Sequence, residues 1–85
     1  MKTIYKYQLK NISQQIIKMP EGAEILSLQT QFGVPCIWVK VDTDGKIVER
    51  NFVLIGTGHP LPENPMTFIG TYQKHEFVFH VFELI

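Results

Sequence analysis

Apolar and polar residues alternate with a period of two along most of the chain, which is typical of β-strands that bury one face. In the N-terminal segment, every second side chain from Thr3 to Leu9 falls on one face, and Ile4 falls on the other face among lysines. Later segments repeat this period and are rich in β-branched and aromatic residues. The pattern predicts strands over residues 1–9, 14–19, 23–32, 34–42, 47–56, 66–73 and 76–85.

Segment 23–32 also admits a helix, because Ala, Glu, Leu and Gln are good helix formers. We expect a strand there, since the alternation is regular and Gly33 follows as in a hairpin turn. Two further hairpins are expected, one joining the first two strands and one built on Asp44 and Gly45. The hairpin between the first two strands turns at residues 11–13. Further turns are expected at residues 20–22 and 74–75, and an irregular loop with three prolines at residues 57–65.

Two features of the C-terminal part bear on the fold. Gly70 interrupts segment 66–73 and indicates a β-bulge or a close approach of another backbone. Segment 76–85 is apolar on both faces, which favours a strand that is central in a sandwich or covered by a second subunit. Together the segments predict an all-β fold, a compact antiparallel β-sandwich or small open barrel of about seven short strands. We expect it to form one domain over residues 1–85.

Composition narrows the classes of protein. The chain has 85 residues, of which 45% are hydrophobic and 19% charged, so a disordered chain is excluded. The formal net charge is zero, which argues against a general nucleic-acid binder. No apolar run approaches the ~20 residues that span a membrane. The chain has a single cysteine and no N-terminal signal pattern, so we expect a reduced thiol and a cytoplasmic location.

Small size predicts a need for partners. A domain of this length buries only roughly 60–65% of the surface that its unfolded chain exposes. It has no internal disulfide, so its stability must come from an efficient core, a metal or an oligomer interface. We therefore expect a homo-oligomer.

The sharpest local feature is the run Gly56-Thr57-Gly58-His59 at the end of a predicted strand. Glycines let backbone N–H groups approach an anion, and successive N–H groups can form an anion-binding concavity. Thr57 and His59 could then hydrogen-bond a phosphate, a ribose or a partner. The alternative is a tight exit from the strand with an exposed His59. No helix follows, so phosphate-binding loops that precede a helix do not apply.

Three other residues are candidates for ligand contact. Arg50 is the chain's one arginine and could clamp a phosphate or carboxylate, or form a surface ion pair. Trp38 and Tyr72, with Phe32, could form a stacking wall for a base, or pack in the core. His80, in mid-strand, is interpreted as a hydrogen-bonded core or interface histidine.

Neither a metal site nor a catalytic arrangement is predicted. The spacing of the three histidines does not favour a zinc site, and several-thiolate sites need more than one cysteine. Cys36 has no base nearby in the sequence, and the acidic residues are scattered. We expect no cofactor and no enzymatic activity.

Several runs from Met19 to Glu83 follow the pattern MP-x-GA-x-IL, W-x-x-VD, R-x-F, GTGH, IGT-x-Q and HVFE. In this pattern the chain resembles a family of small uncharacterised phage and prophage proteins. The resemblance implies a phage accessory protein, and such proteins include oligomers that sequester nucleotide signals of bacterial immunity. By analogy of type we expect binding of a nucleotide-derived molecule, in the host cytoplasm if the protein is phage-encoded.

The alternative hypothesis is a protein-interaction module without a small ligand. It would bind a host or virion protein through an exposed strand edge or through the apolar C-terminal strand. A polar-lined cavity would favour the first hypothesis, and a flat hydrophobic surface would favour the second.

Overall fold

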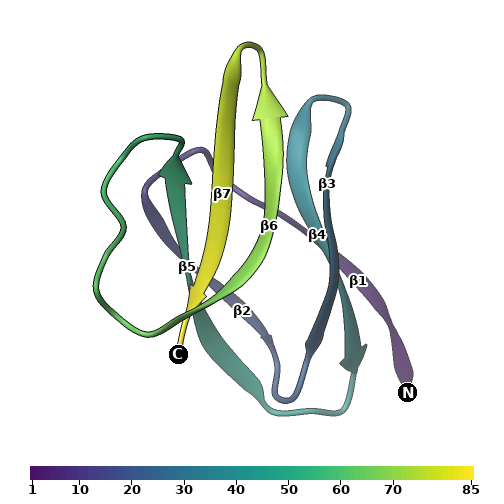
Figure 1. The fold of residues 1–85 in the computed structure, drawn as a ribbon. Coiled ribbons are helices and arrows are strands. Elements are labelled where there is room, and N and C mark those ends of the chain that lie inside the picture. Colours follow the sequence, from purple (N-terminus) through teal and green to yellow (C-terminus); the bar gives the residue numbers. More distant parts are fainter.

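The protein folds as two antiparallel β-sheets that pack face to face (Figure 1). The computed structural model describes residues 1–85 and contains seven strands and no helix. The strands are β1 (Lys2–Gln8), β2 (Gln14–Pro20), β3 (Glu24–Gln31), β4 (Val34–Asp42), β5 (Ile47–Gly56), β6 (Met66–Lys74) and β7 (Phe77–Leu84). One sheet has the order β1-β4-β3 and the other β2-β5-β7-β6. The predicted all-β sandwich is confirmed, the sheets are not closed into a barrel, and segment 23–32 is a strand.

The core lies between the two sheets and is made by the inward side of each strand's alternation. In β4, Ile37 and Val39 are fully buried, and Phe52 of β5 and Val81 of β7 face them with 1% exposure each. Met19 of β2 completes the centre of this cluster. No helix is present, so the structure has no apolar helix that could cross a membrane.

The expected hairpin between the first two strands is wrong. β1 pairs with β4 in one sheet and β2 pairs with β5 in the other, so the intervening segment crosses between sheets. The Leu9 N–H donates to the Pro35 carbonyl at 2.9 Å, which extends the ladder between β1 and β4 past the strand end. Placing the strands in opposite sheets lets Tyr7 and Ile17 cover the same core from two sides.

The hairpin expected at Asp44 and Gly45 is also wrong. A turn does form, with the Gly45 N–H donating to the Asp42 carbonyl at 2.9 Å, but β4 and β5 belong to different sheets. A two-residue hairpin of the common primed type needs positive φ at its first central residue. Neither Asp44 nor Gly45 has a positive φ, so this turn carries the chain from one sheet to the other.

Two other hairpins do form. The turn between β3 and β4 places Phe32 and Gly33 at φ of 50° and 76°, as a type I′ turn requires. β6 and β7 are joined through His75, with a φ of 56°, and Glu76, one residue later than the sequence predicts. β7 lies between β5 and β6, so it is a central strand.

A close contact between β3 and β6 joins one edge of each sheet. The predicted irregularity at Gly70 is confirmed, because the register of β6 against β7 shifts between Phe68 and Gly70. A Cβ added at Gly70 would lie 3.1 Å from both Cβ and Cδ2 of Leu28 on β3. The missing side chain therefore lets the two edges approach.

Replacing Gly70 with alanine should push β3 and β6 apart. Because the clash involves the rigid Cβ of Leu28, we expect Gly70→Ala to lower the free energy of unfolding by about 1–2 kcal/mol. Thermal unfolding measures this, and Gln73→Ala is the control because Gln73 is exposed on the same strand. An unchanged or higher unfolding midpoint for Gly70→Ala would show that β3 and β6 can approach equally well with a side chain at residue 70.

Candidate functional site

The run Gly56-Thr57-Gly58-His59 forms a closed turn at the end of β5. The His59 N–H donates to the Gly56 carbonyl at 3.0 Å, and Gly58 has a φ of 89°. Thr57 does not have a positive φ, so the turn has type II geometry, which favours glycine at its third position. The ring of His59 folds back on Gly56, where an added Cβ would lie 3.3 Å from Nδ1.

The backbone of this turn does not form the anion-binding concavity that the glycines suggested. The Thr57 N–H donates to the Val78 carbonyl at 3.1 Å, and the His59 N–H is already used within the turn. Only the Gly58 N–H lacks a backbone partner, and a concavity of this kind needs successive free N–H groups.

His80 ties the turn to the sheet, and its interpretation as a hydrogen-bonded histidine is confirmed. Its Nε2 lies 2.8 Å from Thr57 Oγ1, and its Nδ1 lies 3.0 Å from Thr71 Oγ1. The Thr57 hydroxyl donates to the Val78 carbonyl at 3.2 Å, so it accepts from Nε2–H. With Nε2 as the donor, a ring without a proton on Nδ1 would accept there from the Thr71 hydroxyl. Sequence reasoning had no signal for this chain of bonds, because it joins residues from three distant segments.

An open hollow of about 580 Å³ lies beside this turn. Phe77 and Phe79 form its apolar part, with ring centroids 6.3 Å apart and planes tilted by 34°. Phe77 is 59% exposed, so its ring is available to a ligand. The hollow thus combines two aromatic rings with polar groups; the residues that line it are Asn11, Gly56, Thr57, His59, Glu76, Phe77, Val78 and Phe79.

Tyr72 lies behind the hollow rather than in it. It is 4% exposed, its hydroxyl donates to Asn11 Oδ1 at 3.3 Å, and its ring centroid is 5.5 Å from that of Phe79. Burial raises the pKa of the Tyr72 phenol above its ordinary value of 10.0. Tyr72 therefore supports two lining residues and belongs to the core.

Arg50 is engaged in a different part of the molecule. Its Nε and Nη2 donate to the two carboxylate oxygens of Glu83 at 2.5 and 2.7 Å, and Nη1 donates to the Ala23 carbonyl at 2.6 Å. The hydrogen bonds to Glu83 raise the pKa of Arg50 above its ordinary value, while burial opposes them. Three donors and the charge are thus used internally, so the geometry does not favour a clamp on an external phosphate.

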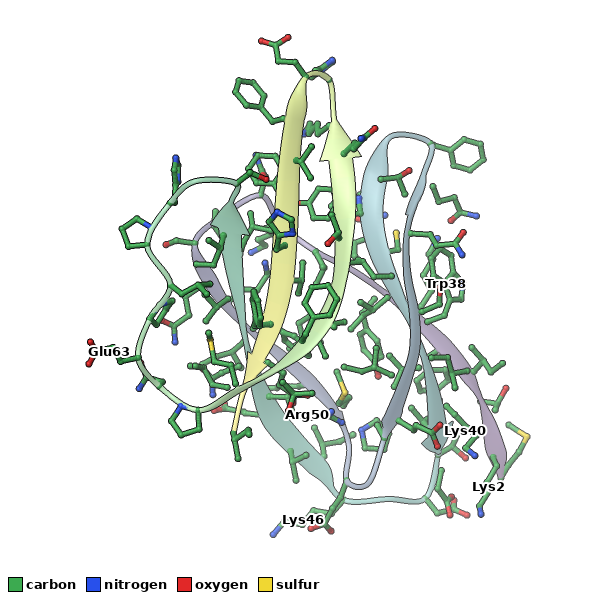
Figure 2. All side chains as sticks on the ribbon, in the orientation of Figure 1. Lys2, Trp38, Lys40, Lys46, Arg50 and Glu63 are labelled. Atoms are coloured by element: carbon green, nitrogen blue, oxygen red, sulfur yellow. The ribbon has the colours of Figure 1, made fainter.

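The expected stacking wall is not assembled. Trp38 lies between the fully buried Ile37 and Val39, so its side chain faces the outer side of the three-stranded sheet. Figure 2 shows Trp38 beside β3 and β4, well apart from Arg50. Phe32 is 98% exposed at the turn between β3 and β4, whereas Tyr72 is buried. The structure therefore brings the glycine-rich turn close to Tyr72 and leaves Trp38 and Arg50 elsewhere.

The remaining candidates do not gather around the hollow. Cys36 is 1% exposed in the three-stranded sheet, and its thiol lies 3.5 Å from the Val34 carbonyl. No three histidine, cysteine or carboxylate side chains cluster anywhere in a way that could hold a metal ion.

Fold and site together define a small two-sheet β-protein with an open aromatic hollow where the end of β5 meets the β6–β7 hairpin. A family model described as "Domain of unknown function (DUF7352)" matches residues 1–85, so the chain belongs to this family. No curated protein and no solved structure matches the chain. The resemblance to an uncharacterised domain family is thereby confirmed.

The bond between Arg50 and Glu83 should be a sensitive point of stability. The two side chains are only 21% and 16% exposed, so removing one partner leaves a poorly solvated charge. We expect Arg50→Met and Glu83→Gln each to lower the free energy of unfolding in urea by about 2 kcal/mol. The double variant Arg50→Met/Glu83→Leu should recover much of that loss.

Lys40→Met is the matched control for this experiment. It breaks the ion pair with Glu24, whose atoms lie 3.5 Å apart and whose side chains are more than half exposed. Its cost should stay below about 1 kcal/mol. Equal losses for Arg50→Met and Lys40→Met would contradict the assignment of Arg50 as a structural residue.

Buried Tyr72 predicts a loss of stability in alkaline solution. Its folded-state pKa is raised above 10.0, so its contribution is complete below pH 10 and declines as the unfolded chain ionises above it. Tyr72→Phe should flatten the fall in the free energy of unfolding above about pH 10, measured by urea titration at several pH values. Gln73→Ala, at the exposed neighbouring residue, removes no titrating group and should leave the slope unchanged. The same slope in the wild-type protein and in Tyr72→Phe would exclude Tyr72 as the cause.

Proposed function

We propose that the protein is a non-catalytic binding protein whose ligand sits in the hollow between the glycine-rich turn and the β6–β7 hairpin. The observation that carries the proposal is the exposed ring of Phe77 next to the half-buried ring of Phe79, beside the polar groups of Asn11 and His59. Small-molecule sites typically have volumes of about 300–1,000 Å³ and combine apolar walls with a few polar groups. The hollow, at about 580 Å³, has this size and composition.

The ligand class that we propose is a nucleotide-derived signalling molecule. Aromatic side chains stack on bases, and each such contact contributes roughly 1–3 kcal/mol. Asn11 and His59 can hydrogen-bond a sugar or a base edge, and the Gly58 N–H has no backbone partner. Arg50 is not part of this proposal, because its charge is paired with Glu83.

We further propose that the protein is a phage-type accessory protein that sequesters this signal and so counters host immunity. The support for this role is the resemblance to small phage proteins. We propose a homo-oligomer, since a second copy could close the hollow over the exposed Phe77.

Native mass spectrometry with mono-, di- and cyclic nucleotides tests the proposal. We expect bound mass in integer steps per chain and an unaltered ligand on denaturation. Phe77→Ala should weaken binding by about tenfold or more, because it removes a stacking ring. Phe32→Ala is the matched control, since Phe32 is 98% exposed and remote from the hollow.

Three results would count against the proposal. Equal weakening by Phe32→Ala would place the site elsewhere, and a chemically altered ligand would indicate an enzyme. The absence of bound mass across the panel would favour a protein-interaction module. The outer face of β7 supports that second candidate, because Val78, Phe82 and Leu84 are half-buried there, and Phe82 contacts the 58% exposed Phe68.

A further inference from the structure

The two sheets have unequal edges. β3 and β6 lie at adjacent edges, contact each other and each carry a register shift, so these edges are unsuited to an added strand. β1 and β2 are the other two edge strands, and both pair with their single neighbour in an uninterrupted register. A regular, open edge is a template for strand addition.

The hydrogen bonds of the ladder show which groups of β1 are free. In an antiparallel pair, alternate residues exchange bonds with the partner strand, and the residues between them point their N–H and C=O groups outward. The Thr43 N–H donates to Met1 and the Leu9 N–H donates to Pro35, so the odd-numbered residues face β4. The free edge therefore presents the backbone groups of the even-numbered residues, which are Lys2, Ile4, Lys6 and Gln8.

The side chains on this edge give it a charge. Residues 1–10 contain Lys2, Lys6 and Lys10 and no acidic residue. Lys6 donates to the neutral Gln31 amide at 2.9 Å, so its charge is not neutralised by that contact. Ile4, between the two strand lysines, is 56% exposed. Lys2 lies opposite Asp42 of β4, which partly offsets its charge, whereas Lys6 lies opposite Trp38. The edge thus offers an apolar side chain between two lysines about 13 Å apart, of which Lys6 has no acid opposite it.

We propose that the free edge of β1 binds an extended acidic segment of a protein partner as an added antiparallel strand. Acidic side chains four residues apart in the segment would face Lys2 and Lys6, and an apolar residue midway would cover Ile4. The backbone groups of β1 would supply the hydrogen bonds to the added strand, and the lysines would make it prefer an acidic segment. This edge is separate from the hollow that we propose for the small ligand.

A second copy of the chain is a poorer occupant of this edge. An antiparallel β1–β1 pair centred on Ile4 would place Lys2 directly opposite Lys6, and like charges directly opposite each other destabilise a sheet. The other open edge, β2, is also less suited to an acidic segment. It has a single lysine, Lys18, which lies opposite Glu49, whereas β1 has two lysines, of which only Lys2 lies opposite an acid, Asp42. In addition, Pro20 lacks an N–H donor.

An NMR titration of the isotope-labelled protein tests the proposal. The probe is a peptide of the same length as β1 (7 residues) with valine at its centre. One glutamate stands two residues before the valine and one stands two residues after it, and all other positions are threonine. We expect chemical-shift changes concentrated at the amides of Lys2, Ile4, Lys6 and Gln8. The peptide with lysines in place of glutamates should bind about tenfold more weakly.

Proline variants separate this edge from the other one. Ile4→Pro removes an outward N–H and no bond to β4, so the fold should survive while binding of the acidic peptide is lost. Ile16→Pro is the matched control, because Ile16 is 54% exposed and its N–H also points outward from β2. Binding should be unchanged in that variant.

A charge reversal keeps the test decisive if Ile4→Pro fails to fold. Lys2→Glu/Lys6→Glu should exchange the preference, so that the lysine peptide binds more tightly than the glutamate peptide. Equal binding of the two peptides to the wild-type protein, shifts centred away from β1, or no shift at millimolar peptide would each overturn the proposal.

Discussion

Arg50 ties the two sheets together at one end of the sandwich, because it is paired with Glu83 within its own sheet and also bonds the Ala23 carbonyl at the start of the other sheet. The Nε and Nη2 groups of Arg50 on β5 donate to the carboxylate of Glu83 on β7. Its Nη1 donates to the carbonyl of Ala23, where the chain enters the other sheet. Only 13 of the 85 residues are buried, so apolar packing alone is limited, and a satisfied polar tie matters more than it would in a larger domain.

The opposite end of β7 is built differently, and the contrast explains where a ligand can bind. Glu83 lies near the C-terminal end of the strand, whereas Phe77 begins it, at a hairpin that extends beyond the sheets (Figure 1). There the bond between Thr57 and His80 holds the glycine-rich turn, and Phe77 beside the turn is 59% exposed. The C-terminal end of β7 is therefore held by the ion pair between Glu83 and Arg50, whereas the ring at its N-terminal end, Phe77, is exposed.

Close packing at one side of the sandwich also decides which sheet edges stay regular. β3 and β6 can approach because Gly70 has no side chain, and their register shifts leave neither edge regular. β1 and β2 have no such neighbour and keep regular edges. The lysines of β1 oppose pairing between copies of the chain and at the same time define the charge of a partner.

The sequence by itself determined the strands, their turns and the bulge at Gly70, because alternation, prolines and glycines act locally. It also indicated that Gly56–His59 is a turn of special geometry. Only the tertiary structure decided which strands pair, since a short connection between strands fits either a hairpin or a crossing between sheets. For the same reason it alone paired Arg50 with Glu83, turned Trp38 outward and placed Phe77 beside His59: these contacts join residues that are distant in the sequence.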